Sequence, residues 1–358
     1  MLSVCVTPLL ALGCQPSAIT VDTEHVSYSH SDGLAPCGGT VSYSDAFAVH
    51  VLDFLELGFS SERRVEYSWL DEPSIAAAGL EFYGCQTRGE RVLCKHPAAT
   101  HEIVHSICNQ YLRPLPNAFF AEGLAVSLEA ATTSNKPIFP GSQAPLNDPL
   151  EQFTANTSLG VDYSLAASFT SFLLYKFGPE SFARFYSGIK WNSSKASVSA
   201  AFLESFDIDV SAAVEEFNSA SVESVCGGMG HSITPFACHG EPIPWLNETT
   251  WSADLELSCS SEDVVGGQAA LAEEAETLYS SFVISVENAG NYSVKVEPRV
   301  ELNRVYIRTC SGCPFERGQV LSPNDAQDVY LDAGEYFINV DWAGDSNATA
   351  SLSIVSAG

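Results

Sequence analysis

The sequence predicts an α+β protein in which a mixed helical and stranded part precedes an antiparallel β-sandwich. Three observations support this fold class. Between residues 45 and 220, apolar residues recur at helical spacing in several segments. From residue 251 to the end, short alternating segments are separated by turn residues at regular spacing. Between these parts, residues 226–250 are rich in Gly and Pro, which is typical of a domain boundary.

The first part is expected to begin with a polar, Ser-rich leader or strand over residues 20–45. An amphipathic helix should follow from Asp45 to Gly58, then an alternating strand over residues 64–70 and a short helix over residues 72–80. A hairpin between Cys85 and Cys94 comes next, and several helices in succession complete this part. These helices are expected at 96–112, 117–132, 163–177, 179–189, 200–206 and 210–220.

The second part is expected to contain seven principal strands. Each segment is short, carries β-branched and aromatic residues, and ends at turn residues. The predicted strands are 253–259, 277–286, 291–298, 304–310, 328–334, 335–344 and 348–356.

Composition excludes two classes of protein. The chain has 358 residues, a net charge of −28 and 46% hydrophobic residues. That much apolar material excludes a disordered acidic polymer. A nucleic-acid partner requires clustered Lys and Arg, and only 16 are present, so no such partner is expected. We expect a monomer.

The cysteine content points to an oxidising compartment. The chain has 11 cysteines, which is high for a reducing cytosol. Cys85 and Cys94 flank a polar turn, so a local disulfide is plausible. Two further local pairs, Cys226 with Cys238 and Cys310 with Cys313, are candidates, although connectivity cannot be derived from the sequence.

The first residues are typical of an export signal. Residues 1–14 are apolar, and a polar stretch follows them. The sequence ALGC before Gln15 resembles a bacterial lipoprotein signal with Cys14 as the lipidated residue, although Ala11 stands where Leu is usual. An ordinary cleaved signal peptide is the alternative. The protein is therefore expected to be exported, either secreted or held at the outer membrane or cell surface, with a lipid on Cys14 as its membrane contact.

The sharpest chemical signal is the segment His101-Glu102-Ile103-Val104-His105. On a helix, residues at i and i+4 share a face, so both imidazoles can bind one Zn²⁺. Glu102 can then reach a water on the metal and take its proton. The alternative is a pair of surface histidines beside a solvated Glu.

A zinc hydrolase needs a third protein ligand and an open position. Downstream lies Phe119-Phe120-Ala121-Glu122-Gly123-Leu124-Ala125, and a short turn between two helices can return Glu122 to the histidines. With this segment the chain resembles the gluzincin metallopeptidases, including the peptidase-MA-like proteins. The resemblance implies that Glu122 is the third ligand of one Zn²⁺. Glu129 is the substitute candidate, and a simple helix N-terminal preference of Glu122 is the alternative.

The resemblance extends to Asp162-Tyr163-Ser164-Leu165-Ala166-Ala167-Ser168-Phe169, which is similar to a Y-x-x-A-x-S-F segment of the peptidase-MA-like proteins. It implies that Tyr163 donates a hydrogen bond to the oxyanion, whereas an aromatic packed on the core is the alternative. It also implies a zincin-like catalytic domain, a small sheet with a helical lobe, over residues 20–225. A leader (1–14), a linker (226–250) and a sandwich (251–358) complete the expected domains. The sandwich resembles the small domains that follow the catalytic unit in many secreted bacterial peptidases.

The hypothesis that follows is an exported zinc metallopeptidase that acts on peptides or proteins. His101, His105 and Glu122 would bind the zinc, Glu102 would act as general base on the zinc-bound water, and Tyr163 would stabilise the oxyanion. Two alternatives remain at this stage. One is a surface lipoprotein with a catalytically degenerate zinc site that binds its ligand through the sandwich, and the other is a zinc hydrolase of non-peptide substrates.

Overall fold

The computed structural model describes ten stretches of the chain. The expected leader with Cys14 lies outside them, as do Cys5, Cys226 and Cys313. Within these stretches, no helix has the length and apolar character that crossing a membrane requires. The described residues are 19–80, 84–129, 146, 149–154, 160–220, 235–269, 277–298, 302–310, 319–343 and 348–356.

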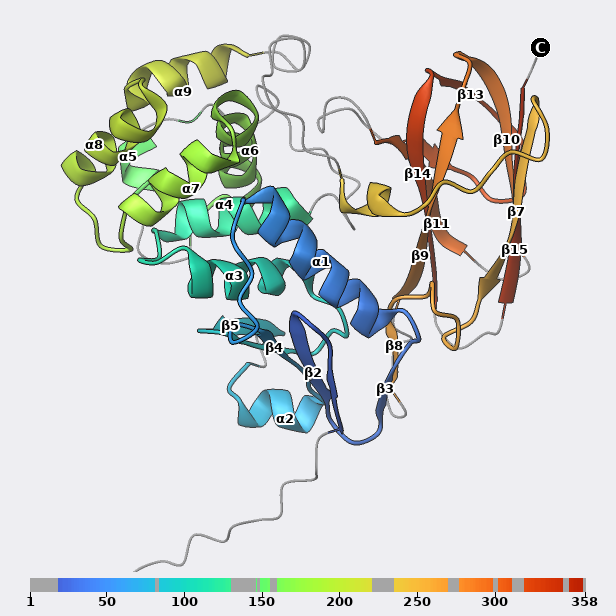
Figure 1. Cartoon of the computed structure of the whole chain (residues 1–358), viewed down its shortest axis with the longest axis horizontal. Coiled ribbons are helices and arrows are strands. Elements are labelled where there is room, and N and C mark those ends of the chain that lie inside the picture. The colour runs from blue at the N-terminus through green and yellow to red at the C-terminus, as the bar shows by residue number, and fades with distance from the viewer. Residues whose placement is uncertain are drawn as a thin grey trace, which may run out of the picture.

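The fold is α+β, and this part of the prediction is confirmed (Figure 1). A mixed sheet and helices form the described residues up to position 220, and antiparallel sheets dominate from Thr250 onward. Two large hydrophobic clusters correspond to these two parts of the chain.

The first part is built on a five-stranded sheet. Its three central strands run parallel, and an antiparallel strand closes each edge. The central strands bury alternate residues, such as Tyr28 and Tyr67, whose stacked rings lie 5.1 Å apart. In spatial order the strands are β1 (Ile19–Asp22), β2 (Val26–His30), β4 (Val65–Trp69), β6 (Arg91–Cys94) and β5 (Cys85–Arg88).

The first long helix begins earlier than the sequence predicts. Helix α1 spans Thr40–Phe54, whereas the periodicity predicted Asp45 to Gly58. Thr40 is fixed at the start because its hydroxyl donates to the Gly266 carbonyl at 2.6 Å, a contact that no local pattern encodes. The helix ends before Glu56, which adopts a left-handed backbone with φ of 55°.

The remaining predicted helices are present in the predicted order, although α8 begins at Lys195 and the short α5 was not predicted. Local signals explain several of their ends. Helix α3 ends before Pro114, and Asn117 accepts a hydrogen bond from the Phe120 N–H at the start of α4. Asp162 accepts from the Leu165 N–H at the start of α6. The helices are α2 (Glu72–Ala77), α3 (Thr100–Tyr111), α4 (Ala118–Glu129), α5 (Pro149–Gln152), α6 (Tyr163–Phe177), α7 (Pro179–Gly188), α8 (Lys195–Phe206) and α9 (Val210–Ser219).

Two four-stranded antiparallel sheets form the second part, in the orders β13-β10-β15-β7 and β12-β11-β14-β9. Both sheets contribute to one core, where Trp251 and Trp342 are fully buried. The seven predicted strands are all present. The strands are β7 (Thr250–Leu257), β9 (Thr277–Val286), β10 (Gly290–Pro298), β11 (Leu302–Thr309), β12 (Gln319–Leu321), β13 (Gln327–Leu331), β14 (Gly334–Ala343) and β15 (Ala348–Ser356).

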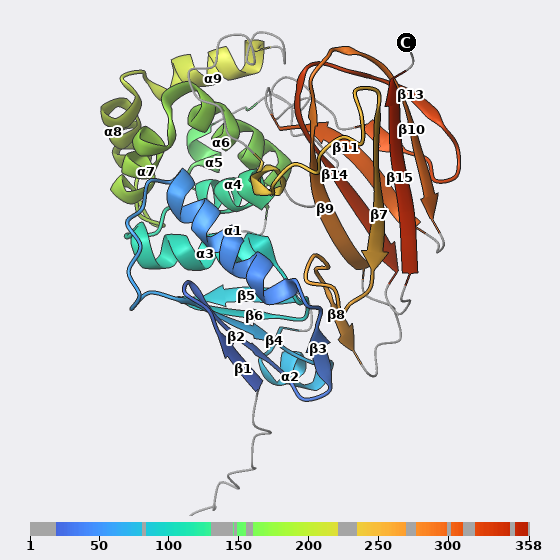
Figure 2. The same ribbon diagram turned by 45° about the vertical axis from the view of Figure 1, so that its right-hand side comes forward.

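A short segment before α1 ties the two parts together. Strand β3 (Leu34–Pro36) pairs with β8 (Gly267–Ala269), and the two lie side by side in Figure 2. Next to this pair, a disulfide joins Cys37 to Cys259. The sequence predicted neither contact, because their partners are more than 200 residues apart.

The described end of the expected linker also packs against both parts. The 3₁₀ helix η1 (Phe236–His239) places the Phe236 ring against those of Tyr43 and Phe47 on α1. It also lies against β9 and β14, which brings Cys238 to Cys310 at the end of β11. The local pairs Cys226–Cys238 and Cys310–Cys313 are therefore wrong, since Cys238 and Cys310 are bonded to each other. The Cys85–Cys94 disulfide is confirmed.

Candidate metal centre

Helix α3 presents the two histidines on one side and packs its other side into the core. Ile103, Val104 and Ile107 are almost completely buried. His101 and His105, one turn apart, have ring centroids 4.8 Å apart, and their Nε2 atoms are separated by 3.1 Å. The amphipathic pattern of the helix thus places both imidazoles next to each other on the face that does not pack into the core.

Helix α4 packs against α3 and places Glu122 beside the two histidines. Its carboxylate Oε2 lies 3.1 Å from His101 Nε2 and 3.2 Å from His105 Nε2. The next residue explains how α4 can be placed so closely. A Cβ on Gly123 would lie 2.4 Å from Thr170 Oγ1 and 2.7 Å from the Ala166 carbonyl, so the absence of a side chain lets α4 pack tightly on α6.

The three side chains can hold a metal ion. His101 Nε2, His105 Nε2 and Glu122 Oε2 form a nearly equilateral triangle with sides of 3.1 to 3.2 Å. Ligand atoms at 2.0–2.1 Å from a tetrahedral ion are separated by about 3.3–3.4 Å, so a small adjustment would accommodate one. The cluster is partly buried. Among the described residues, it is the one group of three His, Cys, Asp or Glu side chains whose ligand atoms lie close enough together to hold a metal ion. With three protein ligands, a tetrahedral ion would take its fourth ligand from water or a substrate.

Glu129 lies on the opposite side of the His101 ring. Its Oε2 is 3.1 Å from His101 Nδ1, whereas Glu122 approaches Nε2. The expectation that Glu129 could substitute as a ligand is therefore wrong. A carboxylate that holds the second nitrogen of a metal-binding histidine fixes the tautomer and the ring orientation, and this is the position that Glu129 occupies.

The two carboxylates stabilise positive charge at this point. Burial alone would lower the pKa of His101, but hydrogen bonds to Glu122 and Glu129 outweigh it and raise the pKa to about 10. Burial would raise the pKa of Glu122, but its hydrogen bonds to His101 and His105 lower it to about 2. In the metal-free protein His101 therefore carries the charge that a bound cation would supply.

Glu102, the predicted base, forms a hydrogen bond with a residue of the neighbouring hairpin. It lies in the first turn of α3, and its Oε2 accepts a hydrogen bond from the Thr87 hydroxyl of β5 at 2.6 Å. The same hydroxyl lies 3.0 Å from the Glu102 backbone carbonyl. Thr87 was not identified from the sequence, because the pairing of this hairpin with α3 is a tertiary contact without a spacing signal.

Tyr163 reaches the site from the first residue of α6. Its ring stacks near that of His101, with centroids 6.4 Å apart and an interplanar angle of 27°, and the side chain is 39% exposed. An aromatic that is buried in the core would not be so exposed. All five predicted site residues therefore come from three consecutive long helices of one region: two histidines and Glu102 from α3, Glu122 from α4 and Tyr163 from α6.

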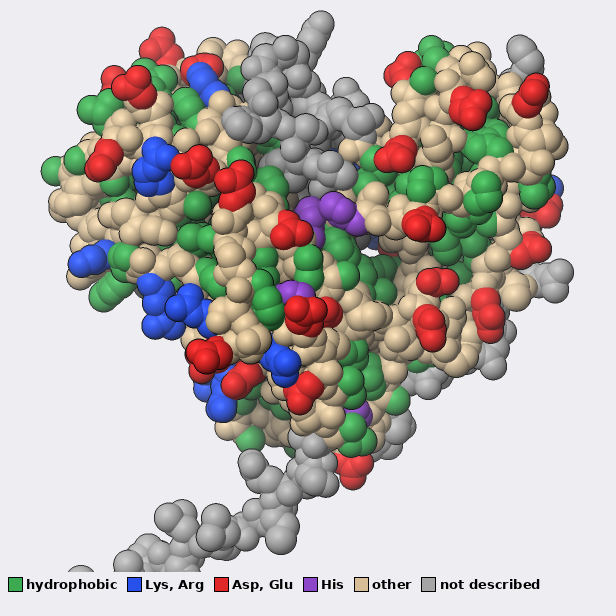
Figure 3. All heavy atoms as spheres, viewed as in Figure 1, with side chains coloured by type: hydrophobic (Ala, Val, Ile, Leu, Met, Phe, Trp, Pro, Cys, Tyr) green, Lys and Arg blue, Asp and Glu red, His purple; other side chains and the backbone are tan. Residues whose placement is uncertain are grey.

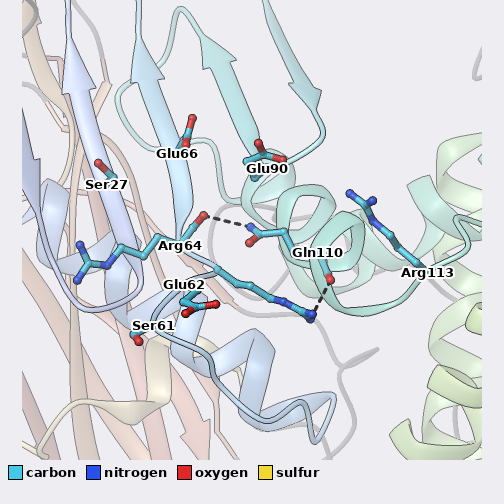
Figure 4. A pocket seen from close by; sticks show the side chains of 9 residues that line it. Ser27, Ser61, Glu62, Arg64, Glu66, Glu90, Gln110 and Arg113 are labelled. Atoms are coloured by element: carbon cyan, nitrogen blue, oxygen red, sulfur yellow. Dashed lines mark hydrogen bonds between the residues drawn. The ribbon is translucent and has the colours of Figure 1, made fainter.

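A separate polar pocket lies near the other end of α3 and contains none of these residues. Figure 4 shows the Gln110 side-chain amide donating to the Arg64 backbone carbonyl. The Gln110 backbone carbonyl accepts from Arg63 Nη1. Three arginines and three glutamates share the lining, so their charges offset one another. On the face shown in Figure 3, acidic side chains are spread over both parts of the molecule.

Comparison with known proteins adds little to this geometry. No family model matches the chain, and no curated protein matches it either. Among solved structures, a family GH115 4-O-methyl-α-glucuronidase with specificity for decorated arabinogalactans aligns with a TM-score of 0.15 and 9% identity. The alignment covers 60% of this chain and 32% of that one. Similarity at this level supports no inference about fold or activity.

Proposed function

We propose that the protein is an exported zinc-dependent metallopeptidase of the gluzincin type. The observation that carries the proposal is the triangle formed by His101 Nε2, His105 Nε2 and Glu122 Oε2. Two neutral imidazoles and one carboxylate match the ligand set of catalytic zinc sites, which keep a fourth position open. The same three residues are those that the gluzincin resemblance implies.

A zinc ion bound there would lower the pKa of a water molecule and polarise a substrate carbonyl. The protein would supply the proton transfer and the orientation. The Glu102 carboxylate accepts a proton from the attacking water and delivers it to the leaving amine. The Tyr163 hydroxyl, at the exposed start of α6, would donate to the developing oxyanion.

The edge strand β5 supports a peptide as the substrate. In the hairpin, the Lys95 N–H donates to the Gly84 carbonyl, and Cys85 lies opposite Cys94. Because hydrogen-bonded pairs alternate in an antiparallel ladder, the backbone groups of Cys85 and Thr87 point away from β6. An extended peptide can add to such an edge, and this edge borders the helix that carries Glu102.

Export is supported by the disulfides. Three are present among the described residues, and bonds of this kind persist in oxidising compartments. We propose that residues 1–14 direct export and that Cys14 is the site of a lipid anchor.

The experiment that tests the function uses the full chain loaded with one equivalent of zinc and a quenched fluorescent peptide library. We expect cleavage that a chelator abolishes and that added zinc restores. Glu102→Gln should retain zinc and lose activity by about 10²–10⁴-fold, the contribution of a general base. Glu72→Gln, the same substitution in the first turn of α2, is the matched control and should cleave like the wild type.

Two results would count against the proposal. A Glu102→Gln variant that cleaves as fast as the wild type would remove Glu102 from the chemistry. A zinc-loaded wild type that cleaves no peptide would leave a metal-binding protein in place of a peptidase.

A further inference from the structure

The hydrogen bond between Thr87 and Glu102 connects the hairpin to the proposed base. Thr87 Oγ1 lies 2.6 Å from Glu102 Oε2 and 3.0 Å from the Glu102 carbonyl oxygen. The shorter contact is the charge-assisted one, so the Thr87 hydroxyl donates its hydrogen bond to the carboxylate and not to the backbone carbonyl. We propose that Thr87 is a positioning residue that holds the Glu102 carboxylate in the orientation required for proton transfer; this inference rests on the proposed function.

Thr87 is itself rigidly placed. It lies opposite Val92 in the β5–β6 ladder, two residues from the disulfide between Cys85 and Cys94. A β-branched side chain has few χ1 choices, so a fixed backbone also fixes its hydroxyl. Its side chain contacts α3, which places Oγ1 against the first turn of that helix.

Glu102 needs such a partner because its side chain is long and partly exposed. Within the described part of the chain, the Thr87 hydroxyl is the hydrogen-bond partner of its carboxylate. The bond holds Oε2 and leaves Oε1 to receive and return the proton. Fixing a catalytic group before substrate arrives removes a reorganisation step from the barrier, and small misplacements of such groups are costly.

The geometry also predicts which kinetic constant depends on Thr87. Its backbone groups face the open edge of β5, where a peptide would pair, whereas its hydroxyl faces Glu102. Removal of the hydroxyl leaves the backbone edge intact. The effect should therefore fall on kcat, with little change in KM.

The competing explanation is that the hydroxyl only ties β5 to the backbone of α3 through the Glu102 carbonyl. That role would affect stability and would not depend on the Glu102 side chain. The two explanations differ in a pair of matched variants. Thr87→Val keeps the shape and β-propensity but removes the donor, whereas Thr87→Ser keeps the donor.

The first measurement is the kinetics of zinc-loaded full-length variants on a peptide that the wild type cleaves. For Thr87→Val we expect kcat to fall about 10–100-fold, with KM and zinc affinity within about threefold of wild type. Thr87→Ser should recover kcat to within about threefold of wild type. Equal kcat values for Thr87→Val and wild type would overturn the proposal. A Thr87→Ser variant as slow as Thr87→Val would also overturn it. If Thr87→Val does not fold, Thr87→Ala takes its place.

The second measurement does not require activity. Urea unfolding of the metal-free protein is compared for wild type, Thr87→Val, Glu102→Ala and the double variant. If Thr87 holds the Glu102 carboxylate, Thr87→Val should lower the urea midpoint of unfolding in the wild-type background. It should have little effect on that midpoint in the Glu102→Ala background. An equal shift in both backgrounds would overturn the proposal. If the wild type cleaves no peptide, the proposed function fails, while this cycle still decides whether Thr87 holds the Glu102 carboxylate.

Discussion

His101 Nδ1 lies 3.1 Å from Oε2 of Glu129, on the side of the ring opposite the metal-binding position. The imidazole is thus held between two carboxylates, with Glu129 at Nδ1 and Glu122 at Nε2. A histidine restrained in this way presents Nε2 to a metal without reorienting, because Glu129 retains the proton on Nδ1 when Nε2 loses its proton to become a ligand.

Glu129→Ala should weaken zinc binding without removing a ligand. We expect a loss of about 10–100-fold in affinity, the usual effect of removing the partner of a metal-binding histidine. Competition with a chromophoric chelator measures it. Glu180→Ala, which breaks an exposed pair with Arg184 on α7, is the control and should bind zinc like the wild type. An unchanged affinity in Glu129→Ala would show that the contact does not orient His101.

Zinc binding at pH 7 should release a proton from His101. The pKa of this residue is about 10 in the metal-free protein, so the imidazole is protonated, whereas a metal ligand must be neutral. Titration calorimetry in buffers of different ionisation enthalpy should give a release of about one proton from this group, and less for Glu129→Gln. The same enthalpy in every buffer would contradict the assignment. Apparent affinity should rise with pH up to the pKa of His101.

Gly123→Ala should destabilise the protein by forcing α4 away from α6. The added Cβ would lie 2.4 Å from Thr170 Oγ1 and 2.7 Å from a backbone carbonyl, which cannot move without the helix. We expect a loss of about 1–3 kcal/mol in the free energy of unfolding, together with weaker zinc binding because Glu122 is adjacent. Gly58→Ala, where a Cβ would meet nothing within 4 Å, should be nearly neutral. Similar denaturation curves for the two variants would contradict the close contact.

The disulfide between Cys37 and Cys259 should contribute more stability than the one between Cys85 and Cys94. Their sequence separations are 222 and 9 residues. In the chain-entropy picture, closing these loops is worth about 5 and about 2.5 kcal/mol, respectively. Paired Cys→Ala substitutions at each bridge, compared by urea unfolding, measure the difference. A larger loss at the shorter loop would contradict the entropic account.

Asp45 should contribute to the acid stability of the first part. Burial would raise its pKa, but hydrogen bonds from the Thr23 hydroxyl and from His25 outweigh it and lower the pKa below its usual value. The stabilisation is therefore present above the unfolded-state pKa of about 4 and is lost as pH falls through the folded-state value. Asp45→Asn should reduce the loss of stability on acidification below about pH 5, whereas exposed Asp53→Asn on the same helix should not. Parallel pH profiles for wild type and Asp45→Asn would refute this.

The parts of this site that the sequence predicts are those encoded by local spacing. His101 and His105 are one helical turn apart, so periodicity brings these two together. Glu122 lies on the next helix after a short break, and the gluzincin resemblance implied its place beside them. The role of Glu129 could have been found, because it lies seven residues beyond Glu122 on a similar face of α4. Thr87 could not, since it reaches Glu102 only through the placement of the hairpin beside α3.

In the fold, too, the features encoded locally were predicted and the long-range contacts were not. Alternating segments predicted the strands of the sandwich, because each strand buries one face. The joining of β3 to β8 and the disulfide between Cys238 and Cys310 involve residues far apart in the sequence. Local pattern carries no information about such pairs, and it favoured nearby cysteines that are not the partners.

The central claim is that His101, His105 and Glu122 are ligands of one zinc ion. X-ray absorption at the zinc edge of the protein loaded with one equivalent of metal tests it most directly. We predict nitrogen and oxygen scatterers at about 2.0–2.1 Å, with outer-shell scattering from two imidazoles and no sulfur near 2.3 Å. In Glu122→Gln the affinity should fall, while His101 and His105 still contribute imidazole scattering. A spectrum with sulfur ligands, or one that His101→Ala leaves unchanged, would contradict the claim.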